Sequence, residues 1–342
     1  MVAGACSTIC GAVVRRAATT LRLIDVPNQR SSHAYPTPMG GGIGIVIGTV
    51  GAMLSLSLAG LDPSQSLTIT LVSGGSLVAV VSCIDDVRPL SAAVRLTTHV
   101  IAAAIAVWYI GPISTIQLSS GITFGPLVGG LISLVWIVGL VNAYNFMDGI
   151  DGMAGGQAIM ASAGLAVVGL LGSQFELVIV GSIVTATSAG FLVHNWPPGR
   201  LFMGDVGSAF LGYVIAVSTL AGARENPAIG PIGVALSWPF VFDTSWTLLR
   251  RLRLRENLFD AHRSHLYQRL VATGPGHAVV TGLYLALAAF GIGAGVGAFV
   301  FPSAALWTLL VYSMSSALVM LGLVWRYESG SSSTSRVAPK AT

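Results

Sequence analysis

The feature that most constrains this chain is a succession of apolar runs, each about as long as a helix that crosses a membrane. Such a helix needs about 20 residues, because it rises about 1.5 Å per residue across roughly 30 Å of hydrocarbon. Only 9% of the 342 residues are charged, whereas a soluble domain carries about 25%. The sequence therefore predicts an all-α, polytopic integral membrane protein with ten or eleven transmembrane helices, and it excludes a soluble enzyme, a disordered chain and a coiled coil. The ten clearest runs are 40–60, 67–84, 93–111, 125–141, 156–172, 175–193, 206–222, 229–248, 278–299 and 303–325.

The distribution of basic residues predicts how the helices are oriented. With ten spans, alternate loops share a side of the membrane, and all but one of the 17 Lys and Arg residues, Arg224, fall in the loops of one side or at the end of a span on that side. Because cytoplasmic loops carry the excess of Lys and Arg, we expect that side, with the C-terminal tail, to be cytoplasmic. The net charge of +4 belongs to these loops, so no nucleic-acid partner is expected.

Three segments outside the ten runs have patterns of their own. Residues 2–14 are apolar and precede two arginines, the reverse of a signal peptide, and we interpret them as the tail of a first span. Residues 112–124 alternate apolar and polar side chains, which predicts a small periplasmic β-hairpin. The Ser-rich end predicts a disordered cytoplasmic tail at 326–342. It would follow a single transmembrane catalytic domain at 1–325.

Acidic residues gather at predicted helix ends on the cytoplasmic side, in three separate loops. Any one of them alone is explained as an ordinary helix cap or turn. Together they would repel one another unless protons or a cation neutralised them. A divalent cation with oxygen ligands is the economical solution, and Mg²⁺ with phosphates is its commonest use. The residues are Asp85, Asp86, Asp148, Asp151 and Asp205.

Spacing adds detail to the middle loop. Asn145, Asp148 and Asp151 lie three residues apart, so in a helical segment they would share one face. Gly149 and Gly152 would let the backbone approach a bulky ligand. This pattern predicts that the three polar side chains point towards one site.

The last large cytoplasmic loop supplies the complementary charge. His262 and His265 are predicted to lie on a short helix that is capped by Asp260 and ends near Gly274. With Arg263 they suit an anionic phosphate or diphosphate. Zinc is a weaker alternative, because no Cys or third His accompanies the pair.

The first cytoplasmic loop is a weaker signal of the same kind. Its Pro and Gly residues predict an irregular segment. The polar side chains in it are candidates for binding a nucleotide or phosphate of the substrate. They are Asn28, Arg30, Ser32 and His33.

Taken together, the motifs resemble the polyprenyl-phosphate N-acetylhexosamine-1-phosphate transferases, which include the phospho-N-acetylmuramoyl-pentapeptide transferases. The matching segments occur in family order over roughly residues 15–325, and they are DVPNQRSSH…PTPMGGG, DDVRPL, NAYNFMDGIDGMAGG, FMGDVGS and AHRSHLYQRL. The first and last are most similar to the branch that initiates O-antigen or related surface glycans. Met39 departs from that branch, which usually has Arg at this position.

The resemblance also implies a role for each matching residue. Asp85 and Asp86 match paired aspartates near the lipid phosphate, and Asn145 and Asp205 match residues that hold Mg²⁺. The acidic pair at the nucleotide diphosphate is matched by Asp148 and Asp151, while His262, Arg263 and His265 match the loop that contacts the sugar phosphate. The four aspartates Asp85, Asp86, Asp148 and Asp151 are thus candidate catalytic residues.

The implied reaction is transfer of an N-acetylated sugar 1-phosphate from a UDP-sugar to undecaprenyl phosphate, with release of UMP. The resemblance places it in a bacterial inner (plasma) membrane. Mg²⁺ is the expected cofactor, with Mn²⁺ as an alternative. Pentapeptide transfer in peptidoglycan synthesis is the closest alternative function, and an ion-coupled transporter or a non-catalytic scaffold belongs to another class. The particular UDP-sugar and a homodimeric state are left open at this point.

Overall fold

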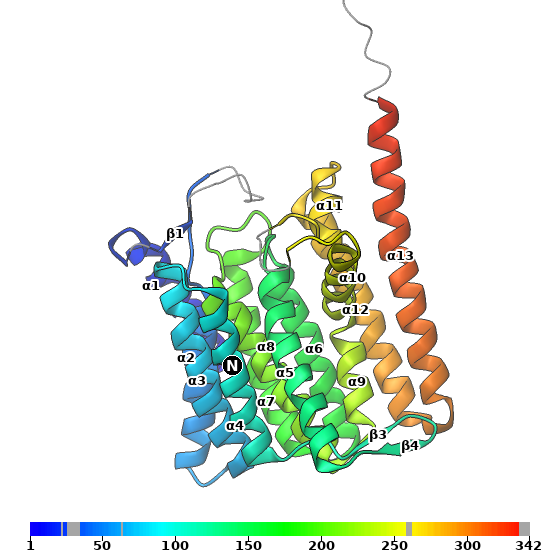
Figure 1. Cartoon of the computed structure of the whole chain (residues 1–342). Helices are drawn as coiled ribbons and strands as arrows, with labels where there is room; N and C mark the ends of the chain where they lie inside the picture. Colours follow the sequence, from blue (N-terminus) through cyan, green and yellow to red (C-terminus); the bar gives the residue numbers. More distant parts are fainter. Residues whose placement is uncertain (22, 26–34, 63, 258–261, 335–342) are drawn as a thin grey trace, which may run out of the picture.

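The computed structural model describes residues 1–342 except 22, 26–34, 63, 258–261 and 335–342. The described chain is a bundle of α-helices with two small strand pairs (Figure 1). The first eight helices are α1 (Val2–Leu21), α2 (Gly42–Leu58), α3 (Gln65–Val87), α4 (Ala92–Ile110), α5 (Pro126–Met147), α6 (Met153–Leu171), α7 (Phe175–Asn195) and α8 (Asp205–Glu225). The others are α9 (Ile229–Leu236), α10 (Trp238–Arg253), α11 (Leu266–Ala272), α12 (His277–Val300) and α13 (Ala305–Thr334). The predicted all-α, multi-pass membrane protein is confirmed.

Nine of the ten predicted spans each coincide with one helix, and the remaining one, 229–248, does not. Within the described residues, eight helices are long and apolar enough to cross a membrane, and α2 is a shorter apolar helix. The expected span 229–248 is instead two helices, α9 and α10, which meet at Ser237. Pro239 in the first turn of α10 explains the break, because its ring and missing N–H do not fit inside a continuous helix. The apolar run 2–14 is part of the longer helix α1.

Helix α8 lies at the centre of the bundle and is buried along nearly its whole length. Its small residues let neighbouring helices approach closely: a Cβ on Gly212 would lie 2.6 Å from the backbone oxygen of Leu140 on α5. Close backbone approach through small residues is a general feature of helix packing in membranes. The first residue of α8, Asp205, is thereby placed in the middle of one end of the bundle.

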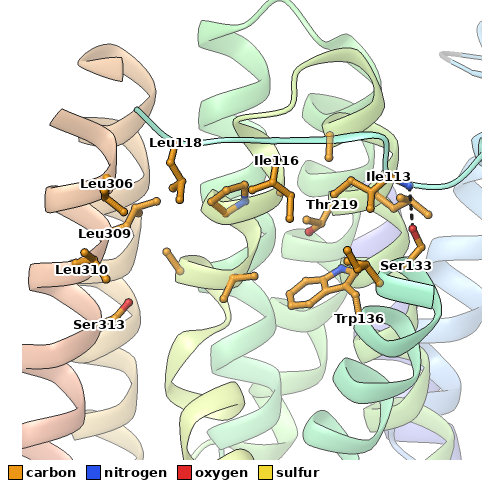
Figure 2. Close-up of a pocket in the computed structure, with 17 residues that line it drawn as sticks. Ile113, Ile116, Leu118, Ser133, Trp136, Thr219, Leu306, Leu309, Leu310 and Ser313 are labelled. Atoms are coloured by element: carbon orange, nitrogen blue, oxygen red, sulfur yellow. Dashed lines mark hydrogen bonds between the residues drawn. The ribbon is translucent and has the colours of Figure 1, made fainter. Parts of the chain in front are cut away.

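The other end of the bundle carries the predicted β-hairpin, which is confirmed. Strands β3 (Thr115–Gln117) and β4 (Gly121–Thr123) pair antiparallel, with Ile116 opposite Ile122. A cavity of about 350 Å³ lies beside it, between the hairpin, α5, α8, α9 and α13 (Figure 2). Its described lining holds no charged side chain, and the hydroxyls of Ser133 and Thr219 are bonded to backbone carbonyls. This apolar cavity is therefore unsuited to phosphate chemistry.

Two further segments bear on the predictions. Strands β1 (Ile24–Asp25) and β2 (Thr37–Pro38) pair antiparallel and close the base of the first polar loop. Helix α13 continues to Thr334, so the first part of the segment 326–342 is helical and not disordered as expected. Ser has a low helix propensity, but this Ser-rich segment continues a long apolar helix that is already formed. Residues 335–342 lie outside the described residues.

Candidate active site

A polar cavity of about 520 Å³ lies at the end of the bundle opposite the hairpin, where α5 ends and α8 begins. Its polar lining comes from α4, α5, the start of α8 and the segment around α11. The cavity brings together residues from both the acidic loops and the histidine loop, as the sequence predicted. Its principal polar side chains are Arg95, His99, Asn142, Asn145, Asp205, His262, His265 and Gln268.

Asp86 holds the start of α8 from the neighbouring helix α3. Its carboxylate accepts hydrogen bonds from the backbone N–H of Asp205 at 2.8 Å and of Val206 at 3.1 Å. A helix leaves these first amides without an internal partner, and its positive end favours a negative charge. Gly204 turns the chain here with φ +76°, and a Cβ on it would lie 2.6 Å from Asp86 Oδ2. Asp86 therefore fixes the position of Asp205.

The glycine-rich end of the first loop packs against the same turn. The backbone N–H groups of Gly41 and Gly42 donate to the carbonyls of Phe202 and Met203, each at 2.9 Å. A Cβ on Gly42 would collide with the backbone of Gly207 on α8. In this structure these glycines allow the helix starts of α2 and α8 to touch, which packs the floor of the site.

Asp85 contacts Arg95 of α4. Its Oδ2 lies 2.9 Å from Arg95 Nη1, and its Oδ1 accepts a hydrogen bond from the backbone N–H of Leu90 at 2.5 Å. The Arg95 side chain is 44% exposed and lines the cavity, whereas the Asp85 side chain is only 5% exposed. These contacts make Asp85 the residue that orients Arg95. The catalytic role predicted for Asp85 stays a prediction.

Asn145 and Asp205 provide neighbouring oxygen atoms for a cation. Asn145 Nδ2 donates to Ser208 Oγ on the first turn of α8 at 3.3 Å, and the Asp205 carboxyl interacts with Asn145 and with Asp85. Within the described residues, no three His, Cys, Asp or Glu side chains form a ready metal-binding group. Mg²⁺ does not need one, because it usually takes one or two protein ligands and completes its shell with water and phosphate oxygens.

Asp148 shows how much negative charge is concentrated here. It caps the C-terminal end of α5 and is half-buried. Burial raises the pKa of the Asp148 carboxyl well above its ordinary value, and the nearby charges of Asp205, Asp86 and Asp151 raise it further. A bound cation would relieve this repulsion, so the residues present fit a divalent metal.

Asp151 lies in the same loop, close enough to raise the pKa of Asp148, but its carboxylate has other partners. Its Oδ2 accepts a hydrogen bond from the Gly199 backbone N–H at 3.0 Å and lies 3.3 Å from His277 Nδ1 at the start of α12. The expectation that Asn145, Asp148 and Asp151 share a helical face is wrong, because α5 ends at Met147 and the loop bends before α6 begins. Gly152, with φ +76°, makes this bend.

The histidine loop differs from its prediction in where the helix begins. Helix α11 starts at Leu266, so His265 is its N-cap residue and His262 precedes the helix. The predicted cap, Asp260, lies outside the described residues, and the helix ends next to Gly274 as expected. The two imidazole rings nevertheless lie together, with centroids 5.1 Å apart.

The charges of this loop are less positive than the sequence indicated. Burial, together with the nearby His265 and Arg251, lowers the pKa of His262 to about 4. His262 is therefore neutral near pH 7 and serves as a hydrogen-bonding group. Arg263 is exposed and is not among the described residues that line the cavity.

The remaining predicted and missed residues complete the site. The predicted substrate-binding residues of the first loop, Asn28, Arg30, Ser32 and His33, lie outside the described residues.

Sequence reasoning missed Arg95 and His99, one helical turn apart on α4, and Asn142, whose amide lies 3.4 Å from His99 Nδ1. The available signal was two ionisable residues within an otherwise apolar span, which usually marks a functional position.

The fold and the cavity define a polytopic membrane protein with a phosphate- and cation-compatible site between its helix ends. A sequence model described as "Glycosyl transferase family 4" matches residues 68–223. The chain is 31% identical over 309 residues to a "Probable undecaprenyl-phosphate N-acetylglucosaminyl 1-phosphate transferase" of Bacillus subtilis, covering 87% of this chain and 82% of that relative. It is 29% identical over 322 residues to a "Decaprenyl-phosphate N-acetylglucosaminephosphotransferase" of Mycobacterium tuberculosis, covering 83% and 78%.

The similarities to these two relatives extend over most of both proteins. The chain belongs to glycosyl transferase family 4. The family resemblance predicted from the five motifs is thereby confirmed.

Proposed function

We propose that this protein transfers an N-acetylated sugar 1-phosphate, with N-acetylglucosamine as the first candidate sugar, from a UDP-sugar to undecaprenyl phosphate. The observation that carries the proposal is the cavity in which Asp205 and Asn145 lie beside Arg95, His262 and His265. A water-soluble sugar nucleotide and a membrane lipid can meet only near the membrane surface, and this cavity lies at the ends of the spanning helices. The names of the relatives support the same donor sugar and lipid class.

The acidic side of the cavity is assigned to Mg²⁺, with Mn²⁺ as an alternative. Asp205 and Asn145 would hold the cation, and Asp148 would add negative charge close by. When bound, the cation neutralises charge on the diphosphate and helps to orient it. Asp86 contributes by holding the backbone at Asp205 in place.

Other side chains of the cavity lining supply donors to phosphate oxygens. Arg95, oriented by Asp85, presents a guanidinium group that suits a phosphate. His265 and His262 line the same cavity from the segment before α11. Phosphoryl transfer depends mainly on positioning and charge stabilisation, so groups of this kind are sufficient for it.

We favour direct attack of the lipid phosphate over a covalent intermediate on Asp85. The second pKa of a phosphate monoester is about 6, so the acceptor is largely dianionic at neutral pH and needs no strong base. One of its oxygens forms a bond to the sugar-bearing phosphorus as the bond from that phosphorus to the UMP oxygen breaks. UMP leaves, and the sugar remains linked to the lipid through a diphosphate.

The proposal also covers location and pathway. The side that carries the cavity is the one predicted to be cytoplasmic from its Lys and Arg residues. Sugar nucleotides are water-soluble, which is consistent with that placement. The lipid-linked product would then begin the synthesis of O-antigen or another surface polysaccharide.

The deciding experiment is an assay of purified protein in lipid nanodiscs with undecaprenyl phosphate, Mg²⁺ and a panel of UDP-N-acetylhexosamines, including UDP-N-acetylmuramoyl-pentapeptide. We expect UMP release that requires both the lipid and a UDP-N-acetylhexosamine. Asp205→Asn should abolish it, while Asp62→Asn, which changes an acid at the hairpin end, should not. Release only with the pentapeptide donor would support the alternative function, and no release with any donor would refute the proposal.

A further inference from the structure

Asp243 is a buried carboxylate for which the proposed reaction has no role. It lies on α10, shortly after the break from α9, and its side chain is 0% exposed. Both of its oxygens accept hydrogen bonds from groups on different helices, and these bonds offset the free-energy cost of burying a carboxylate. The donors are His265 Nδ1 at 3.1 Å, Leu266 N at 2.9 Å, Tyr267 N at 3.1 Å, Tyr284 Oη at 2.6 Å and Thr247 Oγ1 at 3.2 Å.

The bond to Asp243 determines how the His265 ring is used. A carboxylate acceptor requires a proton on Nδ1, and the two ring nitrogens are on different edges of the imidazole. Nε2 is therefore the ring atom left to meet a ligand in the cavity that His265 lines. Two aromatic rings restrict the His265 ring further, because the ring centroids of Phe146 and Tyr267 each lie 5.9 Å from the centroid of the imidazole.

Asp243 also fixes the histidine relative to the acidic side of the site. It holds the first amides of α11, and the hydroxyl of Tyr267 donates to the carbonyl of Phe146 at 3.1 Å. Phe146 follows directly after Asn145 at the end of α5. One buried carboxylate thus connects α10, α11 and α12 to the residue beside the candidate cation ligand.

We propose that Asp243 is a positioning residue, which acts by holding His265 so that Nε2 contacts a phosphate of the sugar-nucleotide donor. This inference rests on the proposed function, because it assigns the donor to the histidine side of the cavity. It differs from a purely structural cap of α11, which would stabilise the helix without any dependence on the His265 ring.

A double-mutant cycle separates these two roles. The variants are Asp243→Asn, His265→Ala and their combination, with Tyr284→Phe as the matched control, because it also removes one hydrogen bond to Asp243 but leaves His265 in place. We expect Asp243→Asn to lower kcat/KM for the donor about 10- to 100-fold, by analogy with the loss of a partner that orients a metal-ligating histidine. The KM for undecaprenyl phosphate should stay nearly constant, and the control should be nearly as active as wild type.

The decisive comparison is made in the His265→Ala background. If Asp243 acts through His265, adding Asp243→Asn there changes donor kcat/KM little, because the interacting partner is already gone. The same fold loss in both backgrounds would overturn the inference and leave Asp243 as a structural cap. If Asp243→Asn does not fold, Asp243→Glu is put through the same cycle, with the same two outcomes.

Failure of the underlying function gives a different result. In that case wild-type protein releases no UMP with any donor, whereas a failed positioning role leaves wild type active and changes only the cycle.

Discussion

Replacing Asp86 by alanine tests whether this acid, one of a pair of adjacent aspartates, holds the site together. The substitution removes the acceptor for two backbone amides at the start of α8, those of Asp205 and Val206. Each buried amide left without a partner costs about 1–3 kcal/mol, so the expected loss of stability is about 2–6 kcal/mol. Asp86→Asn retains one acceptor oxygen and should lose roughly half as much.

One opposing effect lowers the loss. Asp86 and Asp205 are close enough to repel each other, and removing one carboxylate relieves that repulsion. We therefore expect the measured value in the lower half of the range, with a larger loss when Mg²⁺ is present, since a bound cation has already removed the repulsion.

The assay is thermal unfolding of both variants in nanodiscs, followed by tryptophan fluorescence, together with UMP release well below the melting temperature. The melting temperature of Asp86→Ala should be clearly lower than that of Asp86→Asn, which should in turn be lower than that of the wild type. An alanine variant that melted like wild type but had no activity would refute the reasoning, because Asp86 would then act on the reactants and not on α8.

Three further predictions follow from other contacts. Gly42→Ala should destabilise the protein by about 1–3 kcal/mol or prevent folding, because a Cβ there meets the backbone of α8, while Gly51→Ala, where nothing lies within 4 Å, should melt close to wild type. Because the pKa of Asp148 is raised, ionising this carboxyl destabilises the folded state, so the cation-free protein should lose stability as pH rises from about 4 through the raised pKa. The gain in melting temperature on adding Mg²⁺ should grow over the same pH range. An equal gain at every pH in wild type and in Asp148→Asn would contradict this. Arg95→Ala should reduce kcat/KM at least about tenfold through loss of a charge-assisted phosphate contact. Asp85→Asn, which leaves Arg95 in place, should reduce kcat/KM by less. A larger loss for Asp85→Asn than for Arg95→Ala would favour direct participation of Asp85 in the chemistry.

The site could be predicted only in part, and the reason is visible in particular residues. Asn145, Asp205, His262 and His265 were predicted as site residues because each belongs to a short motif next to a predicted helix end, and all four line the cavity. Asp151 belongs to the same motif as Asn145, yet its carboxylate contacts Gly199 and His277. A motif records which residues are neighbours in sequence, and it does not record the direction in which a bend sends each side chain.

Length and hydropathy by themselves determined the membrane bundle, since every turn of a helix in lipid must satisfy its own backbone and present apolar side chains. They also placed most of the scarce acids near predicted helix ends, because charge is costly within the hydrocarbon; Asp243, inside a predicted span, is the exception. The tertiary structure decided which acids line the cavity and which hold other parts of the protein in place. Asp86 reaches α8 across about 120 residues of sequence, and Asp243 reaches His265 from another helix. Such contacts depend on how α8 and α10 pack against their neighbours, and no local pattern of residues contains that packing.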